Sequence, residues 1–155
     1  MAGMKSITDM QERVLKLRNE LKDGSIMQHI IGNYEDEICK MNAGQQLYEQ
    51  GVNAYKVPIM SYRPYTPTTI FIKEQKRQPT DRVTLRDTGA FHSSFYVDAD
   101  NEQFVIRATD EKTPSLIRKY GPEIMGLTPE NKTELTWRWI FPELLQTAKE
   151  IIYGN

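Results

Sequence analysis

Apolar residues recur at helical spacing through the first 44 residues. From Thr8 onward, spacings of four, three and four predict an amphipathic helix on the stripe Met10, Val14, Leu17 and Leu21. Ser6 or Thr8 is the expected cap, and Gly24 suits the left-handed position that ends a helix. A second helix is predicted from Ser25 to about Gly44, on the stripe Met27, Ile30, Ile31, Tyr34, Ile38 and Met41.

Residues 45–51 are compatible with a further turn or two of helix, closed by Gly51, and no helical pattern follows. The stretch from Val52 to Tyr65 reads as irregular and extended, because its prolines and the nearby Pro67 disfavour both a regular helix and a central strand. The run 70–72 is compatible with a short strand or with the start of a helix. Residues 73–80 read as a polar link, and the alternation of Val83 and Leu85 with polar residues predicts a short strand or an extended lead-in.

A turn and a hairpin follow. Asp87-Thr88-Gly89 predicts a capped turn, with Ala90 and Phe91 in the first turn of a short helix. The blocks 95–97 and 104–106, separated by the polar segment 98–102, predict two strands of a hairpin.

Helical spacing returns at the end of the chain. Residues 115–120 predict a short helix that Gly121 and Pro122 end, and Thr128-Pro129-Glu130 is a strong helix start. The last helix has an apolar face, and Pro142 is expected to kink it. The fold class is therefore α+β: N-terminal helices (1–44), then a domain (45–155) with a small antiparallel sheet, a central hairpin and a long kinked C-terminal helix.

Composition narrows the classes of function. The chain has 155 residues and a net charge of −1, from 20 basic and 21 acidic residues, so a dominant nucleic-acid face is not expected. It has one cysteine and no apolar run near the ~18 residues that span a bilayer. Hydrophobic residues make up only 39%, yet aromatic residues include eight Tyr. Such a lean core with many tyrosines is typical of proteins that complete their burial against neighbours.

The candidates for catalysis and metal binding are weak. His29 and Cys39 lack the spacing of a metal site, and the carboxylates of 98–102 lack the pattern of a calcium loop. His92 and Ser93 form no nucleophile elbow, so a hydrolase is only a third hypothesis. We therefore expect no enzyme activity, no cofactor and no metal.

The order of motifs resembles the virion-morphogenesis, or tail-completion, proteins of tailed bacteriophages. The resemblance spans about residues 45 to 153. The matching residues are Leu85, Thr88, Gly89, Phe91 and Ser94 before the hairpin, then Tyr120 and Gly121, then Gly126, Leu127 and Thr128.

This resemblance implies a structural subunit of a virion ring at the head–tail junction or the tail terminus. The ring is expected to be hexameric and to contact neighbouring head–tail or tail proteins, with no small-molecule substrate, cofactor or membrane. The protein is expected in the virion after synthesis in the host cytoplasm. Expected interface or motif residues include, besides those above, the hairpin residues Phe95, Tyr96 and Phe104, and the stretch from Tyr55 to Tyr65 is an expected clasp.

An alternative function stays open. The basic segment 73–86 is also compatible with a small binding or regulatory module that contacts nucleic acid or protein. Salt-dependent DNA binding distinguishes this alternative from a ring subunit.

Overall fold

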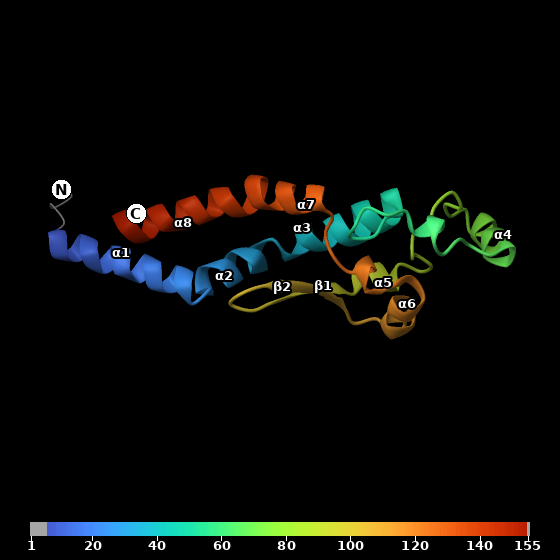
Figure 1. Ribbon diagram of the computed structural model, residues 1–155, viewed down its shortest axis with the longest axis horizontal. Helices are drawn as coiled ribbons and strands as arrows, with labels where there is room; N and C mark the ends of the chain where they lie inside the picture. The colour runs from blue at the N-terminus through green and yellow to red at the C-terminus, as the bar shows by residue number, and fades with distance from the viewer. Residues whose placement is uncertain (1–5, 155) are drawn as a thin grey trace. The chain divides into compact units, whose positions relative to one another are not determined.

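The computed structural model describes residues 6–154 (Figure 1). The α-helices are α1 (Ile7–Lys22), α2 (Ser25–Asn33), α3 (Glu35–Cys39), α4 (Pro67–Gln75), α5 (Ala90–Ser93), α6 (Thr113–Tyr120), α7 (Pro129–Glu134) and α8 (Phe141–Tyr153). Two segments have π-helical geometry, η1 (Lys40–Gln50) and η4 (Leu135–Ile140), and two are 3-10 turns, η2 (Ile59–Ser61) and η3 (Pro122–Ile124). Two strands, β1 (Phe95–Ala99) and β2 (Phe104–Ala108), form the sheet. The expected α+β class is confirmed.

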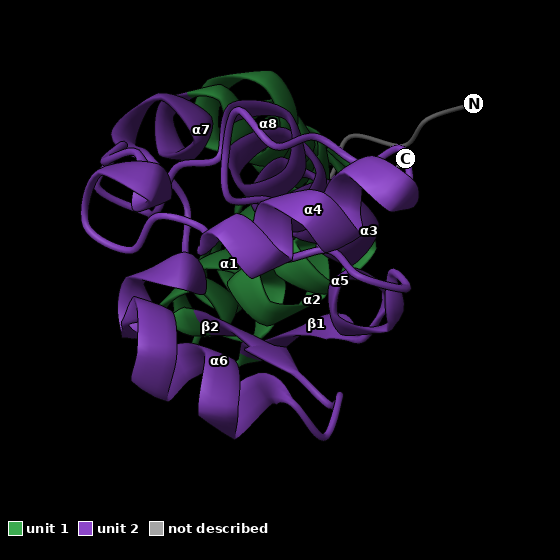
Figure 2. Cartoon of the chain, turned by 90° about the vertical axis from the view of Figure 1, so that its right-hand side faces the viewer, with its two compact units in different colours: residues 1–34, 99–104, 134–155 green, residues 35–98, 105–133 purple. Residues whose placement is uncertain are grey.

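The described chain divides into two compact units (Figure 2). Unit 1 contains residues up to 34, 99–104 and from 134 onward; unit 2 contains residues 35–98 and 105–133. The boundary expected after residue 44 falls inside η1, and the division into domains at that point stays a prediction.

Unit 1 contains α1, α2 and α8. Ser6 caps α1 by accepting a hydrogen bond from the Asp9 N–H at 3.1 Å. The residues at the end of α2 contact α8: Asn33 donates to the Glu143 carboxylate at 2.9 Å, and the Tyr34 hydroxyl donates to the other oxygen of the same group. The helix α2 buries Ile26, Ile30 and Ile31, whereas α1 and α8 bury no residue.

Unit 2 holds most of the core. Its largest fully buried apolar side chains come from helix, turn and loop alike: Ile38, Leu47, Ile59, Val83 and Ile124. A polar network lies among them. Asn42 donates to the Ile124 carbonyl at 3.0 Å, and Gln46 donates to the Gly126 carbonyl at 2.7 Å and accepts from the Thr128 N–H at 2.8 Å. This network fixes the segment 124–128 to η1.

The hairpin has a single register. Asp100 N–H donates to the Gln103 carbonyl, and Thr109 N–H donates to the Ser94 carbonyl, so opposed residues sum to 203 (100 + 103 and 94 + 109). Burial alternates along both strands: Phe95 and Ile106 are buried, and Tyr96 and Val105 are exposed. The predicted hairpin is confirmed.

The C-terminal helical run from Pro129 to residue 153 has the expected kink. Pro142 has no N–H to donate to the carbonyl four residues earlier, and the π-helical segment η4 lies directly before it. Within residues 6–154, no helix combines the length and the apolar character needed to cross a membrane.

The structure decides three local expectations. The helical run does not end near Asn42-Ala43-Gly44; it continues as η1 to Gln50 and ends at Gly51, as expected for the further turns over 45–51, and a break lies earlier, at Tyr34. Of the two alternatives for residues 70–72, the helix is confirmed, because they belong to α4. Of the two alternatives for Val83 and Leu85, the strand is wrong, because Leu85 has a positive φ of 53° that no strand accommodates.

Candidate functional site

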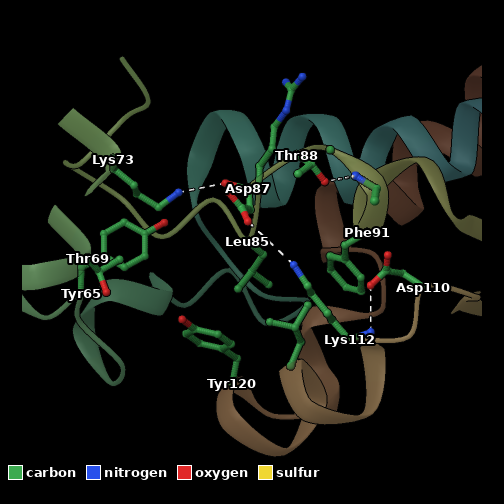
Figure 3. Close-up of a pocket in the computed structure, with 14 residues that line it drawn as sticks. Tyr65, Thr69, Lys73, Leu85, Asp87, Thr88, Phe91, Asp110, Lys112 and Tyr120 are labelled. Atoms are coloured by element: carbon green, nitrogen blue, oxygen red, sulfur yellow. Dashed lines mark hydrogen bonds and ion pairs between the residues drawn. The ribbon is translucent and has the colours of Figure 1, made fainter. Parts of the chain in front are cut away.

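Five of the predicted motif residues meet around one cavity in unit 2 (Figure 3). The cavity has a volume of about 250 Å³. The motif residues in its wall are Leu85, Thr88, Gly89, Phe91 and Tyr120. The remaining lining comes mainly from α4, from the loop before α5 and from α6, so segments far apart in the sequence build a single site.

The backbone before α5 is shaped to place these groups. Leu85 adopts a left-handed φ of 53°, which is uncommon for a residue with a bulky side chain and costs on the order of 1 kcal/mol. Gly89 has a φ of 94° at the start of α5, where only glycine is free of strain. Thr88 accepts a hydrogen bond from the Ala90 N–H at 3.3 Å within the predicted turn, but the N-cap of α5 is Gly89 and has no side-chain cap, so Thr88 does not occupy the cap position.

A buried lysine from α4 forms one side of the cavity. Lys73 is 9% exposed, and its ammonium donates to the Arg86 carbonyl at 2.9 Å and to the Gln78 side-chain oxygen at 3.1 Å. The same ammonium lies 5.1 Å from the centre of the Tyr65 ring. The Tyr65 hydroxyl in turn accepts from the Thr84 N–H at 2.9 Å. Neutral oxygens and an aromatic face therefore solvate this buried charge.

Charged groups surround the cavity. Asp87 binds the Lys76 ammonium at 2.5 Å and lies 3.8 Å from the Lys112 ammonium. The hydrogen bond from Lys76 lowers the pKa of Asp87 below its ordinary value, and the neighbouring lysines add to this effect. Lining residues Lys73, Arg86 and Lys112 outnumber the acids Asp87 and Asp110, so the lining is net positive.

A second, more open hollow of about 660 Å³ adjoins α3, η1 and α5. Its potential nucleophiles are unsuited to catalysis. Burial, reinforced by Glu35 and Asp36, raises the pKa of the Cys39 thiol to about 11. Ser93 donates its hydroxyl to the Gly89 carbonyl. His92 lies in an aromatic cluster with Tyr48, Phe91 and Phe95.

His92 is half-buried, and its Nε2 atom is shielded from solvent. Burial lowers its pKa to about 4, while a hydrogen bond to the Thr84 backbone opposes the shift. Its Nε2 atom has no hydrogen-bond partner among residues 6–154. Ser93 and His92 are therefore not hydrogen-bonded to each other. The described residues also contain no group of three or more His, Cys, Asp or Glu that is placed to hold a metal ion.

The other predicted site residues lie outside the cavity. The Ser94 hydroxyl donates to the Phe91 carbonyl and accepts from the Asp110 N–H, so it joins α5 to the loop after β2. Phe95 and Leu127 are buried, Phe104 is half-buried, Tyr96 is exposed, and Gly121 ends α6 at a φ of 91°. Whether these residues form an interface stays a prediction.

The basic segment 73–86 is largely engaged within the chain. Lys73 is buried, Lys76 binds Asp87, and Arg82 binds Asp81 at 2.8 Å. Arg86 lies over the Tyr48 ring at 4.9 Å.

Part of the cavity wall was not identified from the sequence: Thr69, Asp110, Lys112 and Leu116 had no expected role. Tyr65 lay in the expected clasp, Lys73 and Arg86 in the basic segment 73–86, and Asp87 and Ala90 in the predicted turn, but none of them was assigned to a cavity. One signal for α4 was present: Thr66 followed by Pro67 is a cap and first-turn pair, and Thr66 accepts from the Thr69 N–H at 3.2 Å.

The chain was compared with protein-family models, with curated proteins and with solved structures, and no match was found in any of the three.

Proposed function

We propose that this protein is a structural subunit of a tailed-bacteriophage virion, present as several copies in a ring at the head–tail junction or the tail terminus. One observation carries the proposal. The helices α1 and α8 both have apolar stripes and bury no residue within the described chain.

The apolar stripe on α1 is only partly covered by the rest of the chain. Val14 is 47% exposed and Leu21 is 43% exposed, although α1 and α8 pack against each other. Most of the stability of an amphipathic helix in a protein comes from burying its apolar face. The exposed apolar faces of α1 and α8 therefore suit contact with neighbouring subunits that would bury them.

The motif residues support the same proposal. The residues that carry the resemblance to tail-completion proteins have structural roles. Leu85 and Gly89 adopt positive φ angles, and Phe91 and Leu127 are buried. Ser94 links α5 to the loop after β2 through two hydrogen bonds. Such roles fit a mechanical subunit.

Electron microscopy of the purified full-length protein tests the proposal. We expect closed rings of uniform diameter with a central opening. The result against it is a field of single copies, at all concentrations, together with DNA binding whose affinity falls steeply as salt rises. That combination would favour the binding module instead.

A further inference from the structure

The helix α4 has its apolar and polar faces reversed. It buries Lys73, while Phe71 is 62% exposed and Ile72 is 47% exposed. A surface helix ordinarily turns its large apolar residues toward the core and its lysines toward water. The exposed aromatic ring is therefore available to a partner.

The direction of Phe71 relative to the cavity matters. Thr69 and Lys73 of α4 line the cavity and lie only about 40° apart around the helix axis, whereas Phe71 lies about 160° from each of them. The ring of Phe71 thus projects from the side of α4 opposite to the cavity. One subunit carries a protruding group and a hollow that point in opposite directions.

The cavity is matched to a single large side chain. Pockets for small ligands usually have about 300–1,000 Å³, and this one has about 250 Å³. Leu85, Phe91 and the Tyr120 ring line it (Figure 3), and Leu116 completes the apolar wall. Aromatic pairs across such a wall contribute beyond the area they bury.

The charge beside Phe71 is opposite in sign to the net charge of the cavity lining. Glu74 lies one helical turn from Phe71, is exposed and has no ion-pair partner among the described residues. The cavity has a net positive lining, and Lys112 and Arg86 are exposed there. An acidic group beside the inserted ring is thereby placed to meet a cation of the receiving subunit.

We infer that Phe71 of one copy inserts into the Leu85–Phe91–Leu116–Tyr120 cavity of the next copy, with Glu74 directed to its Lys112 or Arg86. Because the inserted group and the hollow face opposite ways, the contact is head-to-tail and repeats from copy to copy, as a ring requires. The inference rests on the proposed function and names the contact that would close the ring.

Cysteine cross-linking between two tagged forms of the full-length protein tests the contact. Both forms carry Cys39→Ser; one adds Glu74→Cys and the other adds Lys112→Cys, so that the Phe71 ring and the apolar wall of the cavity stay intact. After mixing and mild oxidation, we expect disulfide-linked dimers that contain both tags, because a disulfide forms only where the two Cβ atoms come within about 4.5 Å.

The matched control replaces Lys112→Cys with Arg118→Cys, an exposed residue of α6 that does not line the cavity. The contact predicts a several-fold lower yield of mixed dimers with this control. Equal yields from the two pairs, or no mixed dimer from either, would overturn the contact.

The two proposals fail in different ways. Closed rings by microscopy without the selective cross-link would leave the ring subunit standing and remove the Phe71 contact. A selective cross-link in a protein that forms only open chains or pairs would keep the contact and contradict the ring subunit.

Discussion

At the scale of single residues, His92 links stability to pH. Its pKa is about 4 in the folded chain, against 6.5 ordinarily. As the pH falls from 6.5 toward 4, the unfolded chain takes up a proton that the folded chain does not. The free energy of unfolding should therefore fall over this window, by up to ~2 kcal/mol from this group.

Urea unfolding of the native protein and of His92→Phe, at several pH values from 7 to 4, checks this prediction. The native protein should lose more stability than the variant over that window, since Phe cannot titrate. Parallel profiles for the two proteins would contradict a lowered pKa of His92 in the folded chain.

Arg77 illustrates strain at the end of a helix. It has a φ of 55° after α4, where its N–H donates to the Glu74 carbonyl and the Gln78 N–H donates to the Lys73 carbonyl. This is the Schellman arrangement, in which glycine is the favoured residue. Arg77→Gly should raise the free energy of unfolding by roughly 1 kcal/mol.

Thermal unfolding measures the effect, with Gln75→Gly as the control inside the same helix. Because Gln75 has helical backbone, its replacement should lower stability by about 0.5–1 kcal/mol. Opposite signs for the two glycines support the left-handed conformation at residue 77, and a shared loss of stability would refute it.

At the scale of elements, the junction between η1 and the segment 124–131 depends on Gln46. Its fully buried amide donates to the Gly126 carbonyl and accepts from the Thr128 N–H and from the Asn131 amide. Gln46→Ala leaves several buried groups unpaired, so it should destabilise unit 2 by about 3 kcal/mol.

The exposed neighbour Gln45 provides the matched control. Gln45→Ala should stay within about 0.5 kcal/mol of the native protein in urea unfolding. If both variants unfold at the native urea concentration, the network is not a source of stability.

The helices and strands also show which parts of the fold can be predicted from the sequence. The stripe on α1, the hairpin and the Pro142 kink follow from periodicity, turn chemistry and the missing proline N–H, and they were predicted. The helix end at Gly51 was anticipated, but the break expected near Gly44 was wrong, because Asn42 and Gly44 favour caps and turns in isolation. In the structure, the Asn42 amide bonds the Ile124 carbonyl, 82 residues away, and such a partner cannot be read from local sequence.

The residues that line the cavity likewise include some that were predicted and some that were not. Leu85, Thr88, Gly89, Phe91 and Tyr120 were singled out as motif residues, and the fold brings them together. The contribution of α4 was not foreseeable, because polarity predicts that Phe71 is buried and Lys73 is exposed. The opposite holds, since the Arg86 carbonyl, Gln78 and the Tyr65 ring take the ammonium.

At the scale of the whole molecule, the exposed stripe of α1 predicts an effect on assembly. Replacing Val14 and Leu21 together with Glu should leave the helical circular-dichroism signal nearly unchanged, because neither residue is buried. It should sharply weaken self-association by placing charges where apolar contact is expected. Asn19→Glu, exposed on the same helix, is the control and should assemble as the native protein does.

The central claim is that copies of this chain assemble into a closed ring. The most direct measurement is the absolute mass of the purified full-length protein by light scattering across a concentration series. The account predicts growth to one discrete multiple of the 18.0 kDa chain, with no further increase at higher concentration. A mass that stays at a single chain at every concentration would contradict it.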